Sequence, residues 1–153
     1  MGGRLWAALL LCLPVFVAPA FAGAETKPVL APIHRFIDSM NKGDANAAAA
    51  TFAPDASIID EFAPYHWQGD DAFAKWGADF AAMSKAGGVS DMRLTLGRPR
   101  HVNVSGDHAY VVVPTLITFK QRGKAVREHG TFTFALSGAA GVWRLAAWAW
   151  TTK

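Results

Sequence analysis

The spacing of hydrophobic residues predicts helices in the first half of the chain. Between residues 29 and 40, bulky apolar side chains recur every three or four positions, as on one face of an α-helix, at Leu30, Ile33, Ile37 and Met40. Residues 72–85 repeat this spacing at Phe73, Trp76, Phe80 and Met83. The alanine-rich residues 45–52 predict a short helix between these two, which Gly43 and Asp44 precede as a C-cap and an N-cap.

Alternation of apolar and polar residues predicts strands elsewhere. After a turn at residues 53–55, a short hairpin is expected from residues 56–62 and 67–69. Longer strands follow the last helix, at residues 92–104, 108–120, 125–136 and 142–152. Pro99 is expected to kink or bulge the first of these, and glycine-containing turns separate them.

The order of these elements indicates an α+β fold. Three helices surround a short hairpin, and a meander of long antiparallel strands follows. We therefore expect the helices to pack on one face of a curved, mostly antiparallel sheet. No repeat or linker indicates a second domain in this chain of 153 residues.

Residues 1–24 carry the features of a secretory signal peptide. Arg4 precedes an apolar core at residues 5–17, and small residues follow as far as Ala24. The core is shorter than the span of about 20 residues that a bilayer requires. We expect cleavage after Ala24, export to the periplasm or the medium, no stable membrane anchor after cleavage, and one domain over residues 25–153.

Charge and cysteine content exclude several classes of function. The net charge is +3 and the basic residues form no run, so neither nucleic acid nor an anionic membrane is an expected partner. Cys12, the single cysteine, lies in the predicted signal peptide. The mature domain is therefore expected to have no disulfide, no cysteine nucleophile and no thiolate metal site.

Several motifs resemble the NTF2-like superfamily, which includes ketosteroid isomerases, SnoaL-like polyketide cyclases and scytalone dehydratase. They are FIDSMNKGD at residues 36–44, TFAPDASIID at 51–60, WQGDDAF at 67–73 and WRLAAW at 143–148. The resemblance covers essentially all of the predicted mature chain. It implies a cone-shaped α+β fold with three N-terminal helices on the sheet and an open cavity between them. Because this fold serves many functions, the reaction has to be argued from the residues that line the cone.

The resemblance also implies positions for a reaction. In ketosteroid isomerases an Asp is the base, and a Tyr with a protonated Asp forms the oxyanion hole. Asp60 matches the base, and Phe36 takes the place of the Tyr and has no hydroxyl to donate. The second acid matches a position near His129 or Gly130. Steroid isomerase chemistry is therefore not expected.

The candidate catalytic residues are Asp60, His129 and His34. A poorly solvated Asp60 would have a raised pKa and could remove a proton or orient His129. Alternatively, Asp60 is an acid at a strand end that binds a backbone amide or an arginine. His34 is either a core histidine or a second base lining the cone. The candidate ligand-binding residues are Phe36, Ile58, Phe62, Trp67, Trp76, Phe80, Thr131 and Trp148.

Three functions remain open at this point. The first is an exported protein, expected to be a homodimer, that binds a small apolar molecule without a reaction of its own. The second is a lyase, isomerase or cyclase that uses Asp60 and no cofactor. The third is an interaction module in which Trp148 and Trp150 form a contact surface. No metal site and no nucleotide-binding or hydrolase motif is expected from the sequence.

Overall fold

The computed structural model describes residues 26–139 and 141–153, and the predicted signal peptide lies outside them. This part of the chain contains α1 (Thr26–Lys42), α2 (Ala45–Ala49) and α3 (Ala72–Gly87). Its strands are β1 (Phe52–Ile59), β2 (His66–Gln68), β3 (Val89–Leu96), β4 (His101–Ser105), β5 (His108–Gln121), β6 (Lys124–Ala139) and β7 (Val142–Thr152). None of the described helices is long and apolar enough to span a membrane.

The seven strands form one sheet in the order β2-β1-β7-β6-β5-β3, and β4 pairs with β5. All pairs are antiparallel except β1 with β7, in which Ile58 lies beside Trp148 in parallel register. The predicted meander of long strands is confirmed by β5, β6 and β7. The kink or bulge expected around Pro99 is a full interruption in the structure, where residues 97–100 separate β3 from β4.

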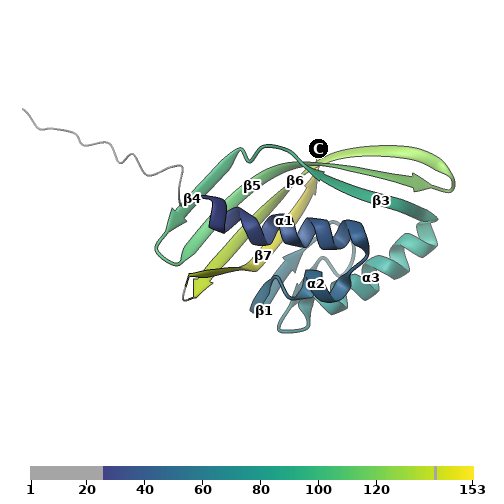
Figure 1. The fold of residues 1–153 in the computed structure, drawn as a ribbon. Helices are drawn as coiled ribbons and strands as arrows, with labels where there is room; N and C mark the ends of the chain where they lie inside the picture. The colour runs from purple at the N-terminus through teal and green to yellow at the C-terminus, as the bar shows by residue number, and fades with distance from the viewer. Residues whose placement is uncertain (1–25, 140) are drawn as a thin grey trace, which may run out of the picture.

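The helices cover one face of the sheet (Figure 1). The apolar face of α1 buries Val29, Ile33, Phe36 and Ile37. On β6, Phe132, Phe134 and Leu136 share the covered face, and each is at most 5% exposed. Burying side chains of this size contributes roughly 1.5–3 kcal/mol each, so helix and sheet stabilise one another through this layer. The fold is thus α+β, as the sequence predicts.

Three helix ends have favourable capping chemistry, and the sequence predicts those at Gly43 and Asp44. The carboxylate of Asp44 accepts a hydrogen bond of 2.9 Å from the amide of Ala47, which caps α2. Gly43 and Gly88 follow α1 and α3 with φ of +71° and +66°, a conformation that glycine adopts without strain. Asp71 precedes α3 but makes no capping bond with its side chain.

Two expectations about the N-terminal part are wrong. The second helix ends at Ala49 rather than at Phe52, and residues 53–55 belong to β1 instead of a turn. The five helical residues bury only Ala48, so no apolar face holds a longer helix against the sheet. The order of elements is as expected, with α3 after the β1–β2 hairpin, but the three N-terminal helices implied by the resemblance are matched only in part, because α2 has five residues.

Candidate functional site

A cavity of about 230 Å³ lies between the helices and the sheet. Its walls come from α1, α3, the loop after β1, and strands β3, β5, β6 and β7. They include seven aromatic side chains, those of Phe36, Trp76, Phe80, Phe119, Phe132, Trp148 and Trp150. For comparison, a dry apolar cavity of about 150 Å³ is enough to hold benzene. The space is therefore large enough for a small organic molecule.

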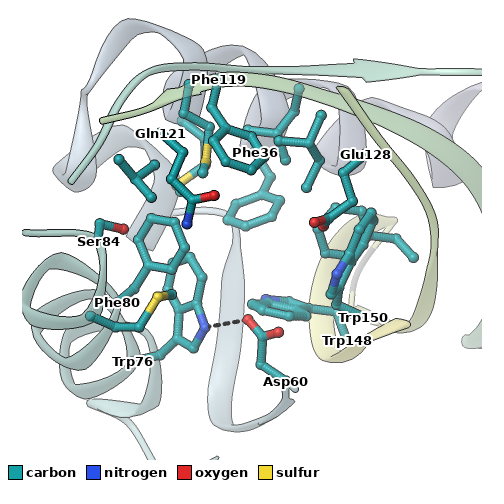
Figure 2. Close-up of a pocket in the computed structure, with 17 residues that line it drawn as sticks. Phe36, Asp60, Trp76, Phe80, Ser84, Phe119, Gln121, Glu128, Trp148 and Trp150 are labelled. Atoms are coloured by element: carbon teal, nitrogen blue, oxygen red, sulfur yellow. Dashed lines mark hydrogen bonds between the residues drawn. The ribbon is translucent and has the colours of Figure 1, made fainter. Parts of the chain in front are cut away.

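Asp60 enters this cavity from the loop that follows β1 (Figure 2). The loop closes on itself, since the amide of Asp60 donates to the carbonyl of Tyr65 and the amide of Tyr65 donates to the carbonyl of Phe62. The indole Nε1 of Trp76 donates to Oδ2 of Asp60 at 2.8 Å. The amide of Glu61 donates to Oδ1 at 2.7 Å. Both carboxylate oxygens are thus held in fixed directions.

The environment raises the pKa of Asp60 above its ordinary value. Burial among apolar side chains is the main cause, because it disfavours the charged carboxylate. The hydrogen bonds from Trp76 and from the amide of Glu61 oppose this increase, and the negative charge of Glu61 adds to it. A raised pKa brings the carboxyl closer to the range in which it can accept and return a proton.

Glu128 on β6 is a second carboxyl group in the wall of the cavity. Burial raises its pKa, and the negative charges of Glu61 and Asp60 raise it further. Glu61 itself lies outside the cavity wall and binds the end of β7. One of its carboxylate oxygens accepts from the amide of Thr152 at 2.8 Å, and the other binds the hydroxyl of the same residue.

Two buried polar atoms in residues of the wall lack a partner within the described part of the chain. They are the indole Nε1 of Trp148 and the hydroxyl of Ser84. Buried polar groups are nearly always hydrogen-bonded. An acceptor on a bound molecule, or a water, near Trp148 would complete this donor's hydrogen bonding.

The structure brings five of the residues proposed from the sequence into the cavity wall: Phe36, Asp60, Trp76, Phe80 and Trp148. Ile58, Phe62 and Trp67 pack behind the wall instead, in the core or against it. Trp67 donates its indole N–H to Asp79 at 2.8 Å, and its ring contacts Phe62 at 5.1 Å between centroids.

The three remaining candidates lie away from the cavity. His34 is exposed on α1, so neither the core position nor the cone position expected for it is correct. His129 and Thr131 alternate with Glu128 and Phe132 along β6 and therefore point to the other face of the sheet. His129 lines a separate shallow hollow there, beside Arg100. No histidine of the described chain lines the cavity with Asp60.

Sequence reasoning missed Glu128 as a functional candidate. The alternation along β6 puts His129 on the face of Thr131 and Glu128 on the face of Phe132, which is the covered one. The sequence signal for Glu128 was therefore an acidic residue at the alternate positions of the strand that also carry buried aromatic side chains. Within the described residues, no group of three or more His, Cys, Asp or Glu side chains is arranged to hold a metal ion.

The chain matches the SnoaL-like domain family over residues 33–146. It belongs to this family. The match includes all the residues that line the cavity except Trp148 and Trp150. No curated protein sequence matches the chain.

Solved structures share the SnoaL-like fold at low sequence identity. A ketosteroid isomerase-like protein from Erwinia carotovora atroseptica has a TM-score of 0.66 at 21% identity, over 86% of this chain and 98% of its own. A putative scytalone dehydratase from Novosphingobium aromaticivorans has a TM-score of 0.67 at 14% identity, over 84% of each chain. A type 2 hexachlorocyclohexane dehydrochlorinase, LinA, has a TM-score of 0.71 at 13% identity, over 85% of this chain and 86% of its own. At these identities the likeness concerns the fold.

Proposed function

We propose that this SnoaL-like protein binds a small, largely apolar molecule in its cavity. The observation that supports this is the cavity itself, which has aromatic and aliphatic walls and only a few polar groups. Ligand sites in proteins typically combine such walls with a few placed polar groups. Here the candidates are the carboxyls of Asp60 and Glu128 and the amide of Gln121.

A cavity-filling variant tests this proposal. Val89 lies in the cavity wall at the start of β3, and Val89→Trp should occupy part of the space. The probe is N-phenyl-1-naphthylamine, a neutral molecule that fluoresces in apolar surroundings. We expect wild-type protein to enhance its fluorescence and Val89→Trp to reduce the effect. The matched control is Val142→Trp, at an exposed position on β7 that is 53% exposed. Equal enhancement by all three proteins would contradict the proposal.

Native mass spectrometry of protein purified from its own host would identify the ligand. A bound mass that is present in wild-type protein and absent from Val89→Trp supports the cavity as its site. A mass retained equally by both proteins would place the ligand elsewhere.

A second function, proton transfer to and from the bound molecule, is favoured by the geometry of Asp60. In this reaction an oxygen of Asp60 forms a bond to the proton of an acidic C–H, and the C–H electron pair stays on the substrate. Return of the proton to another carbon gives an isomerase, and loss of a leaving group gives a lyase. The hydrogen bond from Trp76 orients the carboxylate of Asp60, and the raised pKa of Asp60 favours uptake of the proton. Phe36 supplies no hydroxyl to such a reaction.

Deuterium exchange tests this second function on the ligand identified above. In D₂O, wild-type protein should incorporate deuterium at the acidic carbon, and Asp60→Asn should lose this activity while still binding the ligand. Asp38→Asn, at an exposed position of α1 outside the cavity wall, is the matched control. Exchange at the wild-type rate in Asp60→Asn would rule out Asp60 as the base.

A further inference from the structure

The cavity has a pronounced imbalance of charge. Asp60 and Glu128 line it, whereas the described part of the chain contributes no lysine, arginine or histidine to its wall. The chain as a whole carries a net charge of +3, so this excess of acid is local and does not follow from composition. Glu61 adds a third negative charge close enough to affect both carboxyls.

Neither carboxyl has a cationic partner among the described residues. Asp60 accepts from an indole N–H and a backbone amide, which are both neutral donors. The ion pairs of the described residues are Lys75 with Asp71, His108 with Asp107 and Lys120 with Asp91, so none involves the cavity. Both carboxyls are half-buried, and charges removed from water are usually paired or neutralised. An anionic ligand would be repelled here, and a neutral apolar one would leave the two carboxyls uncompensated.

The aromatic rings of the cavity form the corners of a box. Trp148 stands nearly perpendicular to Trp76, at 86° and 5.2 Å between centroids. It also stands nearly perpendicular to Phe132, at 84° and 5.3 Å. Trp150 packs at 55° against Phe132, with 4.8 Å between centroids. In Figure 2, Asp60 and Glu128 reach the cavity from two sides, with the rings of Trp148 and Trp150 between them.

Such an arrangement fits one class of ligand better than the others. The face of an aromatic ring carries negative charge density and attracts cations, and tryptophan does so most strongly. Boxes of aromatic rings are a general means of binding alkylated ammonium groups. In this cavity, Trp148, Trp150 and two carboxyls surround the same space, and the remaining apolar wall can hold a hydrocarbon body. The ring of Trp76 stacks with Phe73 and Phe80, and its N–H donates to Asp60.

We propose that the ligand of the cavity is an organic ammonium ion, in which a positively charged nitrogen lies between Asp60 and Glu128 and an apolar body fills the rest. This inference rests on the proposed function, because it names the chemical class of the molecule that the cavity binds. The nitrogen compensates the two carboxylates and contacts the rings of Trp148 and Trp150. The apolar body contacts the side chains of β3 and β5.

A pair of ligands with the same shape and different charge tests the proposal. Benzyltrimethylammonium carries the cation, and neopentylbenzene has a carbon atom in place of its nitrogen. We expect wild-type protein at pH 7.5 to bind the cation about tenfold more tightly in calorimetric titrations. Glu128→Gln should weaken binding of the cation by about tenfold and leave that of the neutral molecule within about threefold. Asp38→Asn, which removes the same charge at an exposed position outside the wall, should change neither affinity.

The outcomes separate this inference from the function on which it rests. If neopentylbenzene binds as tightly as benzyltrimethylammonium, and Glu128→Gln affects both alike, the cavity binds apolar molecules and the inference is overturned. If neither molecule binds, the proposed function falls as well. If Glu128→Gln does not fold, the pH dependence of binding to wild-type protein tests the inference instead. Affinity for the cation should then rise with pH as the carboxyls ionise, while affinity for the neutral molecule stays constant. A cation affinity independent of pH would overturn the inference.

Discussion

Replacing Gly130 by alanine should destabilise the protein through the cavity wall. Gly130 lies on β6 between Glu128 and Phe132, on the covered face of the sheet. A methyl group added there would lie 2.3 Å from two ring carbons of Trp150 and 2.6 Å from the carbonyl oxygen of Thr151. Carbon atoms in contact normally lie about 3.5–4.0 Å apart. The ring of Trp150 would therefore have to move by about 1.2 Å or more, toward the cavity or away from the sheet.

The size of the destabilisation depends on how far the atoms around the new methyl group can move. Overpacking of a core typically costs about 1–3 kcal/mol in the free energy of unfolding. We expect Gly130→Ala to lie near the upper end, about 3 kcal/mol, because the oxygen of Thr151 belongs to the backbone and cannot rotate away. For a domain of this size, that loss lowers the melting temperature by about 10 °C. Thermal and urea unfolding, each followed by circular dichroism, measure both quantities.

A second glycine provides a control with the opposite expected sign. Gly77 lies inside α3, and a methyl group there would have no neighbour within 4 Å. Gly77→Ala should therefore stabilise the protein by about 0.5–1 kcal/mol, since alanine loses less conformational entropy in a helix. A Gly130→Ala protein as stable as the wild type would refute the reasoning, because the ring of Trp150 would then have no fixed place against β6.

Three further predictions concern single side chains. The raised pKa of Glu128 means that the folded state holds the proton of this carboxyl more tightly than the unfolded state, so the stability of the protein falls as pH rises above the ordinary pKa of 4.5. Glu128→Gln should therefore raise the melting temperature at pH 7, and this gain should disappear below pH 4. A pH series of melting curves measures both. Trp76→Phe removes a hydrogen bond that lowers the pKa of Asp60, so NMR titration of that carboxyl should give a higher pKa than in wild type, and an unchanged value would contradict the bond. Asp44→Ala should cost about 1 kcal/mol in urea unfolding by removing the cap of α2, whereas Asp71→Ala, at a position with no capping bond, should cost less.

Much of the fold could be predicted from the sequence because its signals are local. The helical spacing of α1 and the alternation along β6 each identify a buried face within one element. The boundary between α2 and β1 could not be found in this way. Alanines favour a helix, but Phe52 pairs with Leu145 of β7, and this contact with a distant strand decides the conformation of the segment.

The site was only partly predictable for a similar reason. The position of Asp60 in the cavity was expected from the family resemblance, and Trp76 was expected there as well. Their hydrogen bond joins the loop after β1 to α3, and no pattern within either segment shows it. His129 was proposed as the partner of Asp60 from its approximate position, although a shift of one residue along a strand moves a side chain to the opposite face. Glu128, its neighbour in sequence, is the residue that reaches the cavity.

The parallel pairing of β1 with β7 has a consequence for the order in which the site is assembled. Ile59, the residue before Asp60, lies beside Ala149 of the last strand, and most of the sequence separates the two. Closing such a distant contact is entropically costly and slow compared with closing the local hairpins. During synthesis, the strand that places Asp60 must wait for β7 to emerge. The carboxylate is therefore expected to reach its working position among the last parts of the molecule to fold.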